Sequence, residues 1–221
     1  MMNIILLGPQ GSGKGTQAEE LVKKFGLHYF EAGKILRSIS ESDNKYAEEV
    51  KKAINGGRLV PDEYMRLIAW DFINKHEGER ENNKGFLFDG YPRSTNQYEH
   101  LKDMLMRFGQ GLNMVVNIEI SEAESIKRLS ARRTCQKCGE IYNLITNPPP
   151  EGRCKCGGEM IQRDDDRPEA IKRRLAIYRE QTHPVFEKAR DEGIGIEIDG
   201  ERPINTISED LVSRIMGAES Q

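Results

Sequence analysis

Short apolar runs alternate with longer segments of helical periodicity along most of the chain. The runs are too short for isolated helices, so we predict buried strands at 3–7, 28–30, 85–89, 114–120 and 195–200. Between them, apolar residues recur every three or four positions, as on one face of a helix. We predict helices around 16–25, 46–54, 64–73, 97–105, 122–133, 170–178 and 207–216, and another that starts at residue 34. The helix from residue 170 should continue past Pro184 with a kink or a break.

This alternation is typical of an α/β fold. Strands that are joined by helices form a parallel sheet with helices on both faces. Ligands in such folds bind beyond the carboxyl ends of the strands. The turns at 8–16, 32–33, 89–90 and 199–200 all follow predicted strands, so we expect them to surround one cleft. The stretch 134–166 breaks the pattern with glycines, prolines and cysteines, which indicates a small insert.

A glycine-rich turn, GPQGSGKGT at 8–16, joins the first predicted strand to the first predicted helix. Glycines let several backbone N–H groups point at one centre, and the helix dipole adds positive potential there. Lys14 adds a full charge for the outer phosphates. Gly15 stands where this motif usually has Ser or Thr, and Thr16 supplies the hydroxyl one residue later. We favour phosphate binding over a plain turn, and predict a P-loop NTPase-type five-stranded parallel sheet with helices on both faces.

Composition restricts the partners that we expect. The 221 residues carry a formal net charge of −3 and 31% charged residues, which favours a soluble protein over a general nucleic-acid binder. This length allows one sizeable core and small insertions. We recognise no apolar stretch near the about 18 residues of a membrane span, and no basic and apolar leader. We therefore expect a cytoplasmic protein without membrane or nucleic-acid partners.

Four cysteines lie close together in the predicted insert, namely Cys135, Cys138, Cys154 and Cys156. Clustered cysteines without a secretion signal favour a metal site over disulfides. The first pair has the Cys-x-x-Cys spacing of a zinc half-site, whereas Lys155 alone separates the second pair, which requires a tighter turn. We favour a structural Zn²⁺ over free thiols and expect it to take no part in catalysis.

An acidic residue, Asp89, ends the third predicted strand. In phosphate-loop proteins, a carboxylate at such a place commonly holds the water shell of Mg²⁺. The alternative is that Asp89 caps a helix N-terminus. We favour the magnesium role because the strand directs Asp89 towards the same edge as the phosphate loop.

Taken in order, these motifs resemble those of the adenylate kinase family, in its long form with a zinc-bearing lid. The resemblance rests on Gly-Lys-Gly-Thr at 13–16, on Gly-Tyr-Pro-Arg at 90–93, which is similar to the family's Gly-Phe-Pro-Arg, and on the cysteine pairs. It implies the reaction ATP + AMP ⇌ 2 ADP with Mg²⁺, carried out by a monomer. It also implies a core at 1–30, 62–130 and 167–221, a helical monophosphate-binding insert at 31–61 and a zinc-binding lid at 131–166.

The resemblance further implies roles for individual residues. On the ATP side these are Gly11, Ser12, Gly13, Lys14, Gly15, Thr16, Arg132, Ile141, Tyr142 and Arg202. On the AMP side they are Ala32, Arg37, Arg58, Leu59, Val60, Gly90, Tyr91, Pro92, Arg93, Gln97, Arg163 and Arg174. The groups expected to act on the transferred phosphoryl group are Lys14, Arg93, Arg128, Arg132, Arg163 and Arg174. Arg128 and Arg132 are four positions apart, so they should share one face of the predicted helix 122–133.

Such a set of cations suits phosphoryl transfer, which depends on in-line positioning and neutralisation of negative charge more than on covalent chemistry. Guanidinium groups match phosphate oxygens in geometry as well as in charge. Water is the competing acceptor. A lid that closes over both substrates would therefore suppress hydrolysis of ATP.

Two alternatives stay open. Ala32 stands where the family usually has a Thr, and Ala at this position resembles the UMP/CMP kinases. Gln97 favours AMP, because a side-chain amide can pair with the donor and the acceptor of adenine. From another class, the chain could be a non-catalytic, nucleotide-gated protein whose zinc knuckle binds RNA or a partner. The negative net charge argues against that interpretation.

Overall fold

The computed structural model describes residues 1–56, 58–77 and 84–218, and its centre is a parallel sheet. The sheet contains β1 (Ile4–Leu7), β2 (His28–Glu31), β3 (Phe86–Asp89), β4 (Met114–Glu119) and β8 (Gly195–Asp199) in the order β2-β3-β1-β4-β8. All neighbouring pairs are parallel. The prediction of a five-stranded parallel sheet is therefore confirmed. No helix in the described ranges is long and apolar enough to cross a membrane.

Alternate side chains of the strands supply two separate cores. Ile5 and Leu7 of β1 pack on one face with α4 (Asp62–Glu77), α5 (Thr95–Arg107) and α8 (His183–Asp191). Ile4 and Leu6 face the other side and pack with α1 (Lys14–Phe25) and α9 (Ile204–Ala218). This separation follows from the two-residue repeat of a strand, and it explains why the central strand β1 is apolar at every position.

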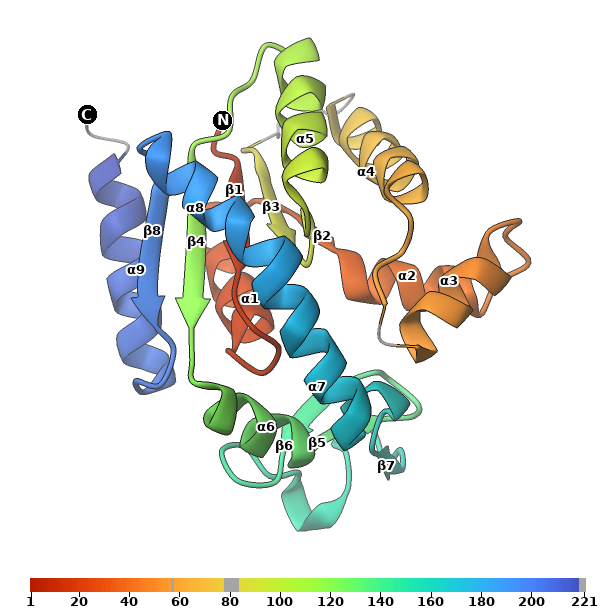
Figure 1. Cartoon of the computed structure of the whole chain (residues 1–221). Helices are drawn as coiled ribbons and strands as arrows, with labels where there is room; N and C mark the ends of the chain where they lie inside the picture. Colours follow the sequence, from red (N-terminus) through yellow and green to blue (C-terminus); the bar gives the residue numbers. More distant parts are fainter. Residues whose placement is uncertain (57, 78–83, 219–221) are drawn as a thin grey trace.

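The carboxyl ends of the strands all point towards the lower part of the molecule in Figure 1. There the loop after β1 leads into α1, and α6 (Glu122–Ser130) follows β4. Beside this edge, α2 (Ala32–Ser40) and α3 (Ala47–Asn55) project together as a helical pair. Val50 and Ala53 of α3 are buried in the same core as Val60, so the pair is fixed to the body of the protein.

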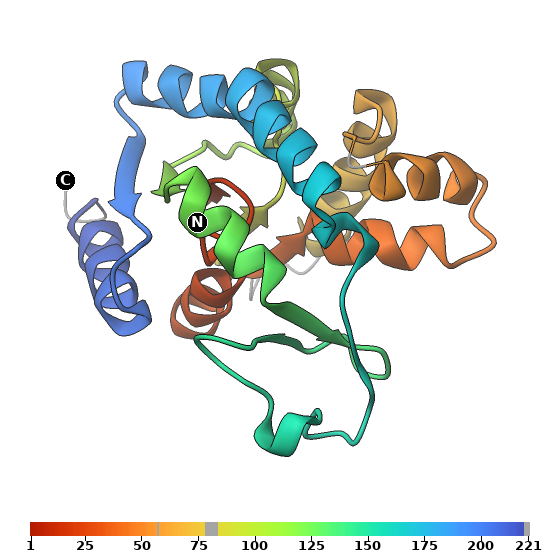
Figure 2. The same cartoon turned by 60° about the horizontal axis from the view of Figure 1, so that its bottom comes forward.

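The insert at the lower end forms a small antiparallel sheet, which Figure 2 brings forward. Its strands are β5 (Arg132–Cys135), β6 (Ile141–Asn143) and β7 (Met160–Ile161), in the order β6-β5-β7. One 3-10 turn lies between β6 and β7 at Pro150–Gly152, and another follows β7 at Asp164–Asp166. We call residues 131–166 the lid.

The predicted helix 122–133 is wrong at its end. The helix α6 stops at Ser130, and Arg132 already belongs to β5, so Arg128 and Arg132 do not share a helix face. The reason is that backbone carbonyls near the end of α6 accept hydrogen bonds from the last residue of β6 and from the residue that follows β6. Asn143 Nδ2 donates to the carbonyl of Arg128 at 2.9 Å, and the N–H of Leu144 donates to that of Ala131 at 3.0 Å. Tertiary contacts thus override the local helical pattern.

Helix α7 (Pro168–Ile177) continues into α8 through a π-helical turn at Tyr178–Thr182. Pro184 has no N–H to donate, and the wider turn just before it absorbs this loss. The predicted disturbance near Pro184 is therefore a π-turn, and the two helices form one long rod in Figure 1. This rod connects the lid to the core.

Candidate active site

The phosphate loop takes a form that glycine permits. Gly8, Gly11 and Gly13 have φ angles of 142°, 85° and 93°. A β-carbon at Gly8 would lie 2.2 Å from the carbonyl oxygen of Ile118, so the loop passes directly against the end of β4. Gly13 is the N-cap of α1 and has no side chain, which leaves the first N–H groups of the helix open to an anion.

Lys14 folds back over this loop. Its Nζ donates to the carbonyls of Gly8 at 2.7 Å and Pro9 at 2.8 Å, and it lies 3.3 Å from Ser12 Oγ. Burial lowers the pKa of Lys14 to about 8, although the carboxylate of Asp89 acts in the opposite direction. A bound phosphate would give this ammonium a stronger acceptor than the two carbonyls.

Asp89 lies at the carboxyl end of β3, beside the start of α1. Its Oδ2 accepts a hydrogen bond from Tyr29 Oη at 3.2 Å, and a β-carbon at Gly15 would lie 4.0 Å from the same oxygen. Burial raises the pKa of Asp89, while Lys14 and Arg93 lower it. Ser94, not Asp89, caps the next helix, since Ser94 Oγ accepts from the N–H of Gln97. The helix-cap alternative for Asp89 is thus excluded.

A pocket opens between α2, the segment before α4, and the turn after β3. It brings together most of the residues expected on the monophosphate side, namely Arg37, Arg58, Leu59, Val60, Gly90, Arg93, Gln97 and Arg174. Gly33, Leu36, Ile54, Met65 and Asp165 complete its wall. Ala32 is only 1% exposed and Tyr91 is fully buried, so both lie behind the wall. The ring of Tyr91 packs against Phe30 and Phe88.

Arginines from the core and the lid converge beside this pocket. The two nitrogens of Arg132, Nε and Nη2, donate to both carboxylate oxygens of Asp166 at 2.8 and 2.5 Å. Arg174 pairs with Asp165 at 2.9 Å, and Arg163 Nε donates to Thr134 Oγ1 at 2.8 Å. Burial is the main cause that lowers the pKa of both Arg163 and Arg174 to about 10, and the positive charge of Arg132 adds to it. The cations therefore repel one another, which an anion between them would relieve.

The sequence analysis did not assign roles to Asp165 and Asp166. The side chain of Asp166 is fully buried, and it lies 3.7 Å from Arg174 as well as against Arg132. Burial alone would raise the pKa of Asp165, but Arg174 and Arg132 lower it below its usual value. These carboxylates hold the guanidinium groups in place before any ligand arrives. The acidic run 164–166 directly after Arg163 was the available signal.

The remaining predicted residues lie around the phosphate loop and the lid. Arg128 pairs with Glu124 at 2.7 Å, and its Nη1 donates to the carbonyls of Gly200 at 3.1 Å and Gly11 at 3.4 Å. Arg202 binds the carbonyl of Asp199 and the carboxylate of Asp210. Ile141 is 44% exposed, whereas Tyr142 is buried inside the lid.

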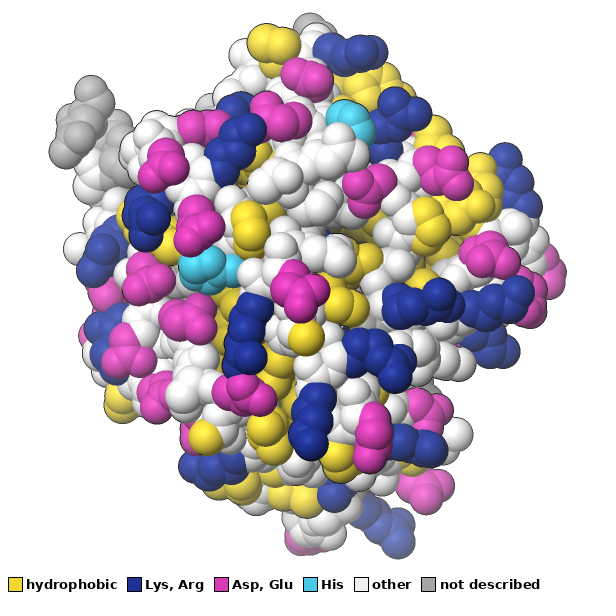
Figure 3. Space-filling view, in the orientation of Figure 1, with side chains coloured by type: hydrophobic (Ala, Val, Ile, Leu, Met, Phe, Trp, Pro, Cys, Tyr) yellow, Lys and Arg dark blue, Asp and Glu magenta, His cyan; other side chains and the backbone are white. Residues whose placement is uncertain are grey.

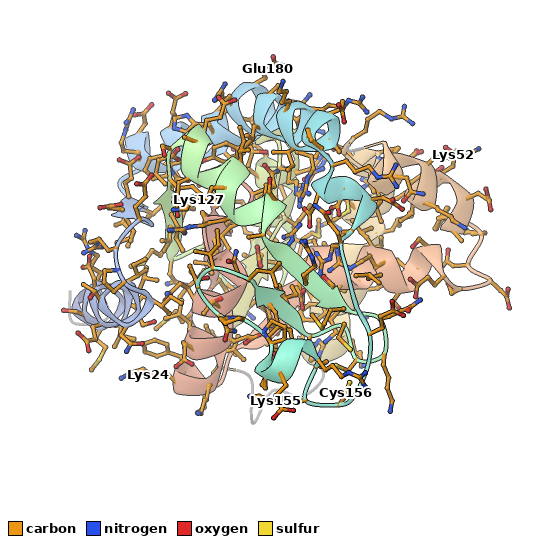
Figure 4. The ribbon with its side chains drawn as sticks, turned by 90° about the horizontal axis from the view of Figure 1, so that it is seen from below. Lys24, Lys52, Lys127, Lys155, Cys156 and Glu180 are labelled. Atoms are coloured by element: carbon orange, nitrogen blue, oxygen red, sulfur yellow. The ribbon has the colours of Figure 1, made fainter. Side chains whose placement is uncertain are left out.

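The four cysteine sulfurs lie within 4.8 Å of one another. The separations of Cys135 and Cys138 from Cys156 are 3.5 and 3.4 Å, and that of Cys138 from Cys154 is 3.5 Å. These distances are far above the about 2.05 Å of a disulfide. They are close to the about 3.8 Å expected between sulfurs that share one tetrahedral zinc. Figure 4 shows Lys155 and Cys156 on the lid.

The turns around the sulfurs fit a metal site in a second respect. The N–H groups of Cys138 and Lys137 point at Cys135 Sγ and lower the pKa of this thiol to about 6, against the effect of burial. A β-carbon at Gly158 would lie 2.5 Å from the same sulfur, so only glycine fits there. Tyr142 Oη lies 3.7 Å from Cys154 Sγ and closes the other side. The short Cys-x-Cys pair thus joins the cluster despite its tighter turn.

Comparison with known proteins gives a consistent result. The sequence model of the adenylate kinase family matches residues 6–194. The chain is 41% identical over 212 residues to an adenylate kinase of Methanothrix thermoacetophila, which covers 95% of this chain and 96% of the relative. It is 37% identical over 212 residues to an adenylate kinase of Archaeoglobus fulgidus, and the alignment covers 95% of this chain and 96% of the relative. It is 38% identical over 213 residues to an adenylate kinase of Staphylococcus epidermidis, and the alignment covers 96% of this chain and 97% of the relative.

Proposed function

The chain belongs to the adenylate kinase family and transfers a phosphoryl group from ATP to AMP, and we propose that Lys14 and the converging arginines carry this transfer. The observation that supports the proposal is that Arg93, Arg132 and Arg174 lie close enough to Lys14 for their charges to lower its pKa. Arg163 lies beside Arg132 in the same cluster. Phosphoryl transfer requires alignment of the two nucleotides and neutralisation of their charge. A cluster of mutually repelling cations is suited to both tasks.

On the ATP side, residues 11–16 cradle the phosphates with backbone N–H groups at the start of α1. Lys14 exchanges its two carbonyl partners for phosphate oxygens. Arg128 and Arg132 reach the phosphates from the base of the lid, while Ile141, Tyr142 and Arg202 surround the base of ATP. The side chain of Tyr142 is buried against Cys154, so Tyr142 would contact the base through its backbone.

On the AMP side, Arg37 and Arg93 bind the monophosphate, and Arg163 and Arg174 approach the phosphoryl group that is transferred. Arg58, Leu59 and Val60 enclose the base together with Gln97. Ala32 is buried and is not among the residues that line the pocket, so we assign its side chain no contact with the base. This favours AMP over the pyrimidine monophosphates that Ala32 alone would suggest.

Mg²⁺ accompanies ATP in adenylate kinases, and Asp89 is the group that would hold it through water. The fit is supported by the second carboxylate oxygen of Asp89, because the hydrogen bond from Tyr29 uses only Oδ2. When bound, the ion neutralises charge on the phosphates. The residues of the chain align the nucleotides and exclude water as the lid closes.

A structural Zn²⁺ would be bound by Cys135, Cys138, Cys154 and Cys156, whose separations fit a tetrahedral thiolate site. It would stabilise the lid, residues 131–166, as a unit distinct from the insert at 31–61 and from the core. We propose that it takes no part in transfer, since the sulfurs lie within the lid's own turns.

We also propose that the protein acts as a cytoplasmic monomer without nucleic-acid or membrane partners. Acidic and basic side chains are interspersed over the face in Figure 3, in line with the net charge of −3. On this face, the described residues form no single basic stripe of the kind that binds nucleic acid. Size-exclusion chromatography with light scattering should give the mass of one chain, and the mass of a dimer would contradict this part of the proposal.

The test of the function is an assay of nucleoside diphosphate formation from MgATP with AMP, CMP, UMP or GMP. We expect turnover with AMP to exceed that with each other acceptor. A preference for CMP or UMP would mean that Ala32 marks a changed pocket. No turnover with any acceptor, in folded and zinc-loaded protein, would favour a non-catalytic nucleotide-binding protein.

A further inference from the structure

The side-chain amide of Gln97 is held at both ends. Its Oε1 accepts a hydrogen bond from the backbone N–H of Arg93 at 2.8 Å, and its Nε2 donates to Asp62 Oδ1 at 2.6 Å. Gln97 is only 2% exposed and lines the pocket. Asp62 lies in the first turn of α4, and folding brings it to Gln97 from 35 positions away.

These two partners determine which end of the amide is oxygen and which is nitrogen. If the amide turned over, Nε2 would face the N–H of Arg93 and Oε1 would face the carboxylate of Asp62. In this buried site a donor would then face a donor and an acceptor would face an acceptor, so both hydrogen bonds would be lost. The carboxylate is itself held, since Asp62 Oδ2 accepts from Asn96 Nδ2 at 3.0 Å.

A fixed amide recognises one pattern of base edge. After its two internal bonds, Gln97 keeps one hydrogen on Nε2 and one lone pair on Oε1. Adenine offers an amino donor beside a ring-nitrogen acceptor, which matches this pair. Hypoxanthine has the same size but offers a carbonyl acceptor beside an N–H donor, which opposes it. An amide that is free to turn over could pair with either base.

We propose that Asp62 is a specificity-determining residue, which makes the pocket select amino bases over oxo bases by fixing the orientation of Gln97. Asp62 acts as a positioning residue, because it touches Gln97 and not the substrate. The inference rests on the proposed function, in which the pocket holds AMP and Gln97 faces its base. Of the two groups that hold the amide, Asp62 is the one that a substitution can remove, since Arg93 contributes its backbone.

The test compares AMP with inosine monophosphate as phosphoryl acceptors from MgATP. The diphosphate products are separated by chromatography, and kcat and KM are determined for each acceptor. In the wild type we expect a large ratio of kcat/KM for AMP over inosine monophosphate. In Asp62→Ala the ratio should fall by about tenfold or more, since a Gln97 amide that can turn over pairs with either base and no longer discriminates. The fall should come from a lower KM for inosine monophosphate and a higher KM for AMP.

Further variants separate this effect from a loss of structure. Asp62→Ser retains a side chain that favours a helix start but is too short for the same bond, so its ratio should also fall. Asp62→Asn retains an acceptor oxygen and should keep a ratio closer to that of the wild type. Glu63→Ala is the matched control, because it removes another acid from the first turn of α4 and leaves the partners of Gln97 intact. Its ratio should stay within about twofold of wild type.

The outcomes distinguish this inference from the proposed function. Absence of AMP turnover in the wild type would overturn the function itself. A wild-type ratio in Gln97→Ala would show that Gln97 does not face the base, which would overturn both the Gln97 assignment and the role of Asp62. If Gln97→Ala loses the ratio but folded Asp62→Ala and Asp62→Ser retain it, the inference about Asp62 alone is wrong.

Discussion

Asp166 should contribute strongly to stability, because it is the buried partner of two arginines. Its side chain is fully buried and binds Arg132 through both oxygens, and the side chain of Arg132 is only 17% exposed. Removing one partner of a buried ion pair typically costs about 3–5 kcal/mol. Arg132 keeps some access to water, and Asp165 remains beside Arg174 at 2.9 Å. We therefore expect Asp166→Ala to lower the free energy of unfolding by about 3 kcal/mol.

The assay for Asp166→Ala is denaturant unfolding followed by circular dichroism, together with a thermal melt. For a chain of this size, about 3 kcal/mol corresponds to a fall in Tm of about 6–12 °C. The kcat for ADP formation should fall about tenfold or more, since Arg132 loses the group that orients it. Both measurements are needed because the lid could unfold separately from the core.

Asp164→Ala provides the matched control for this prediction. Asp164 lies in the same 3-10 turn, but it is 69% exposed and pairs with Arg167, which is 72% exposed. Such a surface pair contributes at most about 1 kcal/mol. Two results would refute the assignment of Asp166 as a buried partner that stabilises Arg132. One is a free energy of unfolding for Asp166→Ala within about 0.5 kcal/mol of that of the wild type. The other is an equal loss of stability in Asp166→Ala and Asp164→Ala.

Two further predictions concern the phosphate loop and the lid. Burial lowers the pKa of Lys14 to about 8 in the free protein, and it is the protonated amine that binds phosphate. The kcat/KM for MgATP should therefore be level at lower pH and fall as the pH rises above about 8. A profile that stays flat to about pH 9.5 would contradict this prediction. Metal-replete protein should contain one zinc per chain, and a chelator should lower Tm and expose residues 131–166 to proteolysis while AMP turnover persists at low temperature. Unchanged Tm after complete removal of zinc would exclude a structural role.

The central strands could be predicted from the sequence because both of their faces are buried. Runs such as 4–7 are apolar at every position, and Ile4 and Ile5 indeed pack into different cores. The proximity of Cys135 to Cys138 and of Cys154 to Cys156 was likewise predictable, since two residues separate the first pair and one residue separates the second. In each case the signal lies within a few residues of the chain.

Contacts between distant segments could not be predicted in this way. The end of α6 depends on Asn143 and Leu144, which belong to the lid and leave no mark on the sequence of the helix. The pairing of Arg132 with Asp166 joins positions that are 34 residues apart. Gln97 was assigned to the base from its position in a motif, but its hold by Asp62 appears only once α4 and α5 are packed together. The charged network of the site is thus a property of the tertiary fold.

The most direct test of the account is the turnover of Arg93→Ala with MgATP and AMP. Arg93 lies in the pocket close to Lys14, and its Nε donates to the carbonyl of Gly90 at 2.8 Å. The matched control is Arg190→Ala, an exposed arginine on α8. The account predicts that kcat/KM for AMP falls about a thousandfold in Arg93→Ala, with the fold preserved, and stays within about twofold of the wild type in Arg190→Ala. Near-normal turnover in Arg93→Ala would contradict the claim that the converging cations carry the transfer.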